Sequence, residues 1–371
     1  MGEGPDPWYP AGNSAERTVT TVCAPESATG FRHRVADHAA SGALRDLLEH
    51  HGLSYVREPL SEGAVFGLSG ALALRARIVA APPAAIDLDG RDPSLELELC
   101  RHLGIRADWC TTDEPTEAWE LLHAELRAGA PTLVRADAGT LEYRYSGRHD
   151  TRHAIVVTSY DASAGVVWVA DPSFPEPQSC TLDGLARARH VPAYPEAARH
   201  GLLRLRRMQC LADPYDAIRA ALRRTVGNMR AAHAPPHPQT HSGLQAIDAI
   251  VDVWPRLAEM PGDRLGHTLG ALRFRIRDDG TGGALYRSLQ ARFLHDAAAL
   301  LGSAGLGRAA LVCDDLADAW RGLAGALDLA DAGAGAAHRA AAPWLRRVQA
   351  FEHRHVEALE AHLRMRRAGA V

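Results

Sequence analysis

The sequence predicts an α+β domain followed by an all-α helical domain, and three observations support this fold class. The 371 residues suffice for two domains of ordinary size, and a content of 46% hydrophobic and 23% charged residues is typical of globular chains. Helical and strand patterns alternate from about residue 30 to 200, whereas apolar residues recur at helical spacing from about residue 205. We therefore expect a flexible lead-in over residues 1–25, the α+β domain over 26–204 and the helical domain over 205–371.

The α+β domain is predicted to begin with a helix over residues 36–52. Asp37 can accept an N–H group of its first turn, three leucines share one apolar face, and Gly52 tolerates the left-handed conformation of a helix end. A second helix is predicted over residues 116–129, where Gly129 is followed closely by a proline.

Three β-branched stretches in the same domain predict strands. They cover residues 131–137, 153–161 and 165–174. Only a short Ala-Ser-Ala-Gly segment separates the last two stretches, so these two are expected to form a β-hairpin.

The helical domain shows apolar residues at helical spacing in three stretches, 213–229, 285–302 and 314–330. Two segments rich in Pro, Gly and Ala, 233–243 and 331–343, are expected to be loops between helices. The predicted helices would give this domain an all-α architecture.

Composition excludes several classes of function. The formal net charge of −4 gives no support for a nucleic-acid partner. Lysine is absent, so all 41 basic residues are arginine, which excludes a Walker phosphate loop and a lysine nucleophile. The histidine-rich segments 233–241 and 353–355 suggest a metal only superficially, so we expect no metal site.

The cysteines and the apolar runs indicate a cellular setting. The six cysteines are scattered without a C-x-x-C pair, which argues against a disulfide framework and favours a reducing cytoplasm. The N-terminus lacks the apolar core of a secretion signal, and no run reaches 18 apolar residues. We therefore expect a cytoplasmic protein without a membrane partner.

Three positions suggest nucleophilic catalysis. Residue 39 lies at a predicted helix start, where a cysteine would be held as thiolate, His153 opens a strand, and Asp171 ends the paired strand. Papain-like enzymes need these parts, namely an activated nucleophile, a histidine base and a group that orients the second imidazole nitrogen. A turn centred near residues 162–163 would place His153 opposite Asp171.

The sequence also resembles a known family. The stretches HAASGALRDLLEHHGL and LSEGAVFGLSGAL, over residues 38–53 and 60–72, are similar to the first two motifs of the butirosin-biosynthesis protein H family. The strands that carry His153 and Asp171 resemble its third motif, shared with bacteriocin-processing cysteine peptidases, and GGALYRSLQARFL at residues 282–294 resembles the helical domain that follows. The resemblance covers roughly residues 30–365 and implies a papain-like first domain.

The chain departs from this family at the nucleophile. The residue that follows the motif histidine is cysteine in the family and Ala39 here, although the thirteen-residue interval to Gly52 is kept. The alanine is either a substitution made to trap a substrate complex or a natural loss of the thiol. The presence of His153 and Asp171 favours the first explanation.

The resemblance implies transfer of an acyl group from an acyl carrier protein thioester to a small-molecule amine in specialised-metabolite biosynthesis. A cysteine at position 39 would form the acyl-enzyme, and the helical domain would cover the cleft. No cofactor is implied, since the phosphopantetheine arm of the carrier protein is part of the substrate. Two alternatives stay open: a thioesterase or peptidase with the same site, and a non-catalytic acyl-binding protein in which Ala39 is native.

Further residues are candidates for substrate binding. Glu62 and Asp137 are carboxylates that could receive the amine, and Arg148 with its neighbours His149 and Arg152 could contact the phosphate of the carrier arm. Each also has a plainer alternative. Glu62 could be an acid at a helix start, Asp137 simply ends a strand, and the three loop residues could form a solvated rim.

The motif histidine, His38, is also a binding candidate, whereas Ser41 is expected to be a packing residue. His33 occupies the place where bacteriocin peptidases have a glutamine six residues before their cysteine, so the side-chain oxyanion donor stays open. The arginine-rich segment 218–230 is either a solvated face or a docking site for an acidic carrier protein. Ala-rich helices near the C-terminus would tolerate a homodimer.

Overall fold

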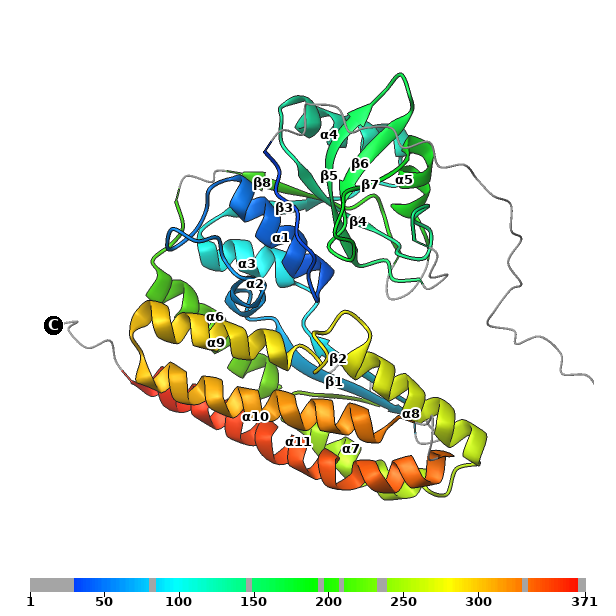
Figure 1. The fold of residues 1–371 in the computed structure, drawn as a ribbon, viewed down its shortest axis with the longest axis vertical. Helices are drawn as coiled ribbons and strands as arrows, with labels where there is room; N and C mark the ends of the chain where they lie inside the picture. The colour runs from blue at the N-terminus through cyan, green and yellow to red at the C-terminus, as the bar shows by residue number, and fades with distance from the viewer. Residues whose placement is uncertain are drawn as a thin grey trace, which may run out of the picture.

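The computed structural model describes residues 30–79, 85–144, 149–192, 197–206, 210–231, 239–328 and 333–365 (Figure 1). The predicted lead-in over residues 1–25 lies outside these ranges. In Figure 1 the described chain forms an upper body around a six-stranded sheet and a lower body of long helices.

The helices and strands alternate in the first half of the chain, as predicted. The helices are α1 (Ala39–His50), α2 (Glu62–Leu68), α3 (Leu95–Leu103), α4 (Pro115–Arg127), α5 (Leu182–Ala188), α6 (Pro214–Met229), α7 (Leu244–Leu257), α8 (Gly262–Arg277), α9 (Arg287–Leu301), α10 (Ala304–Ala326) and α11 (Gly333–Arg364). The strands are β1 (Leu72–Val79), β2 (Ala85–Arg91), β3 (Arg106–Cys110), β4 (Thr132–Ala136), β5 (His153–Asp161), β6 (Val166–Ala170), β7 (Gln178–Thr181), β8 (Leu202–Arg206) and β9 (Thr240–Ser242).

The upper body contains an antiparallel sheet with the strand order β3-β8-β4-β5-β6-β7. Successive side chains of a strand point to opposite faces, and β5 buries both of its faces. Val156 belongs to the core that includes α1, whereas Ile155 and Val157 belong to the core that includes Leu122 of α4. The predicted helix over residues 116–129 and the predicted hairpin correspond to α4 and to β5 with β6. The helix predicted over residues 36–52 is α1, but it begins only at Ala39. The predicted cap by Asp37 is wrong, because α1 has no side-chain cap and the Asp37 carboxylate accepts from Arg292 of α9 instead.

A smaller antiparallel sheet, β2-β1-β9, connects the two halves of the sequence. Arg75 pairs with Ser242 and Arg77 with Thr240, so a strand of the first half is hydrogen-bonded to the second half. The expectation of an all-α second domain is not confirmed, since part of the predicted loop 233–243 is strand β9. Buried residues of β1 and β2 also share one core with α7, α8, α10 and α11. The boundary at residue 204 stays a prediction.

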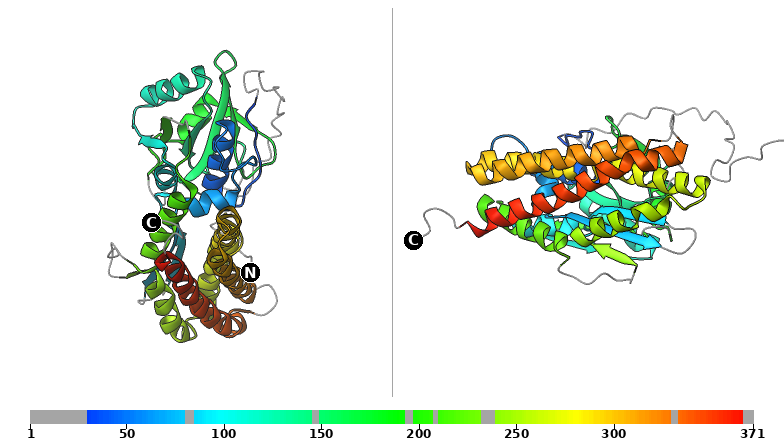
Figure 2. Two further views of the ribbon diagram at one scale, coloured as in Figure 1. Left: turned by 90° about the vertical axis from the view of Figure 1, so that its left-hand side faces the viewer. Right: turned by 90° about the horizontal axis from the view of Figure 1, so that it is seen from below.

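The lower body is a layer of long helices in which α10 packs against α9 and α11 (Figures 1 and 2). The predicted helices at residues 213–229 and 285–302 correspond to α6 and α9. The predicted loop 331–343 is wrong from Gly333 onward, because α11 begins there and continues through Pro343. Alanine fills this segment, and its high helix propensity outweighs the glycines. No helix in the described ranges has both the length and the apolar character needed to cross a bilayer.

Helix α2 approaches α9 closely because Gly67 has no side chain. A Cβ atom on Gly67 would lie 1.9 Å from Cγ of Phe293, which is buried. We expect Gly67→Ala to lower the free energy of unfolding by about 1–3 kcal/mol through overpacking. Gly227→Ala in α6 is the matched control, since nothing lies within 4 Å of its Cβ position and alanine is the better helix former. Chemical denaturation of both variants measures the difference, and equal stabilities would contradict the close approach.

Candidate active site

The N-terminus of α1 forms one wall of the candidate site. Ala39 is its first residue, and His38 before it is extended, with φ −128° and ψ 120°. The N–H groups of a first helical turn have no acceptor within the helix, and Ala39 and Ala40 both line a cavity. The wall therefore presents backbone donors and the positive end of the helix dipole to the cavity.

His153, the first residue of β5, forms a hydrogen-bonded pair with Asp171. Nε2 of His153 lies 2.9 Å from Oδ2 of Asp171, and the carboxylate is fully buried. Because an ionised carboxylate only accepts, Nε2 carries the proton and Nδ1 is the basic nitrogen. His153 lines the same cavity as Ala39, so the structure brings together the three positions that the sequence suggested.

The register of the hairpin differs from the predicted one. Val156 pairs with Ala170, and the ladder is irregular between Val157 and Ser159. Continuing this register places Asp171 beside Ile155, two residues past His153, so the expectation that His153 and Asp171 lie directly opposite is wrong. The pair forms along the diagonal of one sheet face, which long side chains can span.

Two further groups, absent from the predicted site residues, hold Asp171. Nη1 of Arg144 donates to its Oδ2 at 3.1 Å, and the hydroxyl of Tyr143 donates at 3.2 Å. Burial alone would raise the pKa of Asp171, but His153, the N–H of Ser173 and Arg144 outweigh it and hold the pKa below its ordinary value. Asp171 is therefore ionised at neutral pH and can stabilise a charged imidazole. Arg144 and Tyr143 both belong to the segment between β4 and β5, and its content of Tyr, Arg and His was the only sign in the sequence that it contributes to the site.

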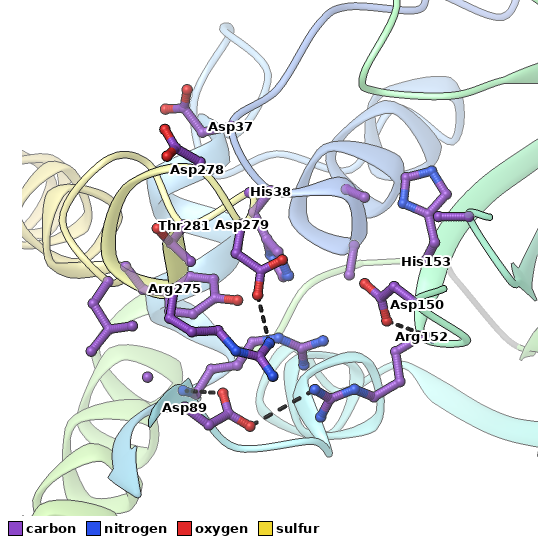
Figure 3. A pocket seen from close by; sticks show the side chains of 18 of the residues that line it. Asp37, His38, Asp89, Asp150, Arg152, His153, Arg275, Asp278, Asp279 and Thr281 are labelled. Atoms are coloured by element: carbon purple, nitrogen blue, oxygen red, sulfur yellow. Dashed lines mark hydrogen bonds and ion pairs between the residues drawn. The ribbon is translucent and has the colours of Figure 1, made fainter. Parts of the chain in front are cut away.

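The cavity has a volume of about 430 Å³ and takes its walls from both bodies. The upper body contributes the start of α1 and the loop before β5, and the lower body contributes the end of β2 and residues from the segment 274–286. Figure 3 shows Asp278, Asp279 and Thr281 of that segment across the cavity from His153. Within the described ranges, no group of three metal-ligating side chains is present.

Two residues of the lower wall have a strained backbone. Leu285 and Tyr286 have φ values of 47° and 70°, and such conformations cost on the order of 1–3 kcal/mol each for residues other than glycine. The buried Arg287 holds them, because its Nη1 donates to the Leu285 carbonyl at 2.7 Å and its Nε to Glu352 at 2.8 Å. The ring of Tyr286 is thereby fixed 5.2 Å from that of His38, measured between centroids.

The predicted substrate-binding carboxylates position other parts of the site. Glu62 accepts from the backbone N–H groups of His38 at 2.8 Å and Asp37 at 3.2 Å. Asp137 accepts from the ring of His149 at 2.7 Å and from a backbone N–H of the same loop. Neither carboxylate is among the described residues that line the cavity. Their contact with substrate stays a prediction. The bonds of Glu62 position the start of α1, and those of Asp137 position the loop before β5.

The other predicted binding residues are distributed as follows. His38, His149 and Arg152 line the cavity, whereas Arg148 lies outside the described residues. Nδ1 of His38 lies 2.8 Å from Oγ of the buried Ser41. Burial and the nearby positive charges lower the pKa of His38 well below its ordinary value, so its imidazole is neutral.

His33 is not available as an oxyanion donor in this conformation. Its Nδ1 lies 3.2 Å from Asp46, and its Nε2 lies 2.8 Å from the carbonyl of Phe174. Both ring nitrogens are therefore engaged.

Glu62→Gln tests the positioning role of Glu62. An amide has a single acceptor oxygen, so one of the two backbone N–H groups would lose its partner, and we expect a loss of about 1 kcal/mol in the free energy of unfolding. The exposed Glu58 of the same segment supplies the control, Glu58→Gln, which should leave stability unchanged. Thermal unfolding measures both, and an unchanged midpoint for Glu62→Gln would contradict the role.

Together, these features define a mixed α/β protein whose candidate site is a helix start that faces a histidine–aspartate pair. Residues 38–172 match the family described as Butirosin biosynthesis protein H, N-terminal, and residues 183–359 match a Domain of unknown function (DUF4872). The first half of the chain therefore matches the N-terminal domain of the butirosin biosynthesis protein H family, and the second domain follows it. No curated protein matches it.

Proposed function

We propose that this site is built to move an acyl group from an acyl carrier protein thioester to an amine during natural-product biosynthesis. The observation that carries the proposal is the His153–Asp171 pair, 2.9 Å apart, in the cavity that the first turn of α1 also lines. The family match supports the biosynthetic setting, because the matched domain is described as part of a butirosin biosynthesis protein.

With cysteine at position 39, the reaction has two steps. The thiolate, paired with the imidazolium of His153, attacks the carrier thioester carbonyl, and the backbone N–H of residue 39 stabilises the oxyanion. The carrier thiol leaves with a proton from His153, which forms the acyl-enzyme. An amine then attacks the acyl-enzyme while His153 accepts its proton, and collapse of the intermediate releases the amide and the cysteine thiol.

The chain carries Ala39, and this observation favours a second function, the non-catalytic binding of an acyl compound. Without the thiol, no acyl-enzyme forms, and the cavity holds the acyl donor or acceptor non-covalently. The codon at position 39 of the source gene separates the cases, since a cysteine codon establishes an inactivating substitution and an alanine codon favours a binding protein.

The Ala39→Cys variant tests the acyl-transfer proposal directly. Incubated with acyl-loaded carrier proteins, it should gain the mass of the acyl group, and an added amine should discharge that mass as an amide. Release of the free acid regardless of amine would instead indicate a thioesterase. The His153→Ala form of the same variant is the control and should gain no mass. Absence of any acyl-enzyme with the whole carrier panel would overturn the proposal.

A further inference from the structure

A buried arginine lines the cavity without an ion pair. Arg91 ends β2, and its side chain faces the cavity with only 5% of the residue exposed. Within the described part of the chain, no carboxylate lies within the 4.0 Å limit of an ion pair with its guanidinium. A guanidinium is charged at any physiological pH, and burying an unpaired charge is costly.

The direct partners of the Arg91 guanidinium are neutral, although its backbone N–H donates to Asp89 at 3.3 Å. Nη1 donates to the carbonyl of Asp92 at 3.3 Å, and the hydroxyl of Tyr286 lies beside the guanidinium. Burial lowers the pKa of Arg91, but the adjacent Tyr286 and the carboxylates of Glu96, Asp89 and Asp150 together raise it more strongly. Glu96 is bound to Arg135 at 3.3 Å. The positive charge of Arg91 is therefore kept, and no contacting group neutralises it.

Arg152 brings a second positive charge to the same cavity. Its side chain is 16% exposed, and its Nη2 lies 3.8 Å from Oδ2 of Asp89, a long contact that Figure 3 marks. Its Nε is buried and has no hydrogen-bond partner among the described residues. Two carboxylates lie near both arginines. Asp89 contacts Arg152 only weakly, and Asp150 accepts from the backbone N–H of Arg152 at 3.0 Å.

The acidic side chains of the opposite wall are already paired. Asp279 bonds to Arg275 at 2.7 Å, and Asp278 bonds to Arg273 at 3.2 Å. Asp37 at the helix start bonds to an arginine of α9. The guanidinium groups left for a ligand are therefore those of Arg91, which no carboxylate contacts, and of Arg152, which has only the long contact to Asp89. Both lie on the wall formed by the end of β2 and the loop before β5.

We infer that Arg91 and Arg152 bind an anionic group, a carboxylate or a phosphate, of the molecule that occupies the cavity. The inference rests on the proposed function and adds a substrate class to it, since the acyl donor or the amine must carry such a group. Paired N–H donors of a guanidinium fit the oxygens of either anion. The proposed recognition is non-covalent, so it does not need the thiol at position 39.

The test measures binding of two anions to the protein with Ala39. Inorganic phosphate and succinate are titrated separately by isothermal calorimetry at low salt. We expect saturable binding of at least one anion, weakened at least about tenfold in Arg91→Gln and in Arg152→Gln, and partly restored in Arg91→Lys. Arg77→Gln is the matched control, since Arg77 is an exposed arginine of β1 outside the cavity lining.

The outcomes separate the sources of the anion and the two proposals. Binding of phosphate alone assigns the site to the phosphate of the carrier arm, and binding of succinate alone assigns it to a carboxylate of the acyl or amine substrate. No saturable binding of either anion, or equal affinity in Arg91→Gln, overturns the inference. Should Arg91→Gln fail to fold, Arg152→Gln decides. Arginine-dependent binding together with no acyl-enzyme in Ala39→Cys would overturn the proposed function only.

Discussion

The Ala39→Cys variant is expected to alkylate at position 39 at least about tenfold faster than at Cys210 at pH 6.5. The positive end of the α1 dipole and the imidazole of His153 both favour a thiolate at position 39. They should therefore lower the pKa of the introduced thiol below the ordinary value of about 8.5. Among the cysteines that the structure describes, Cys210 is the exposed one. Burial raises the pKa of Cys100 and of Cys180 to about 12, so these thiols should stay unreactive.

Iodoacetamide labelling followed by peptide mass analysis measures each site in one sample. Combining Ala39→Cys with His153→Ala should reduce labelling at position 39 toward the rate of Cys210. A rate at position 39 that equals that of Cys210, or that does not depend on His153, would contradict the arrangement of α1 and β5 described above.

Asp171→Ala is expected to lower the free energy of unfolding by about 3–5 kcal/mol. The carboxylate is fully buried, and its loss leaves Arg144 without its partner and the imidazole of His153 without its acceptor. Asp171→Asn keeps an acceptor oxygen and should cost less, about 1–3 kcal/mol. Urea unfolding measures both variants. The exposed Asp318 of α10 gives the control Asp318→Ala, which should be indistinguishable from the parent.

The same carboxylate predicts a pH dependence. The folded state holds the pKa of Asp171 below that of an unfolded aspartate, which is about 3.9. Its stabilisation is therefore complete above the unfolded value and is lost as the pH falls through the folded value. The stability difference between the parent and Asp171→Asn should narrow below about pH 4. A difference that widens in acid would contradict the lowered pKa.

Local signals explain which elements could be predicted. The β-branched run at residues 153–161 coincides with β5, and the glycine and proline that follow residue 127 end α4 where expected. The irregularity between Val157 and Ser159 leaves no such signal, so the predicted register was two residues off. β9 was missed because three residues of Thr, His and Ser are too short and too polar to resemble a strand, and only pairing with β1 makes them one.

The sequence by itself determined the family and a helix that begins close to residue 39. It also determined that a histidine and an aspartate follow on two neighbouring strands. These features depend on neighbouring residues, whose spacing and chemistry can be read along the chain. Only the tertiary structure decided what surrounds them: Arg144 against Asp171, Glu62 beneath the start of α1, and Arg91 with the segment 274–286 as the far wall. The physical reason is distance along the chain, since Arg91 and Tyr286 meet across nearly two hundred residues and such contacts produce no local periodicity.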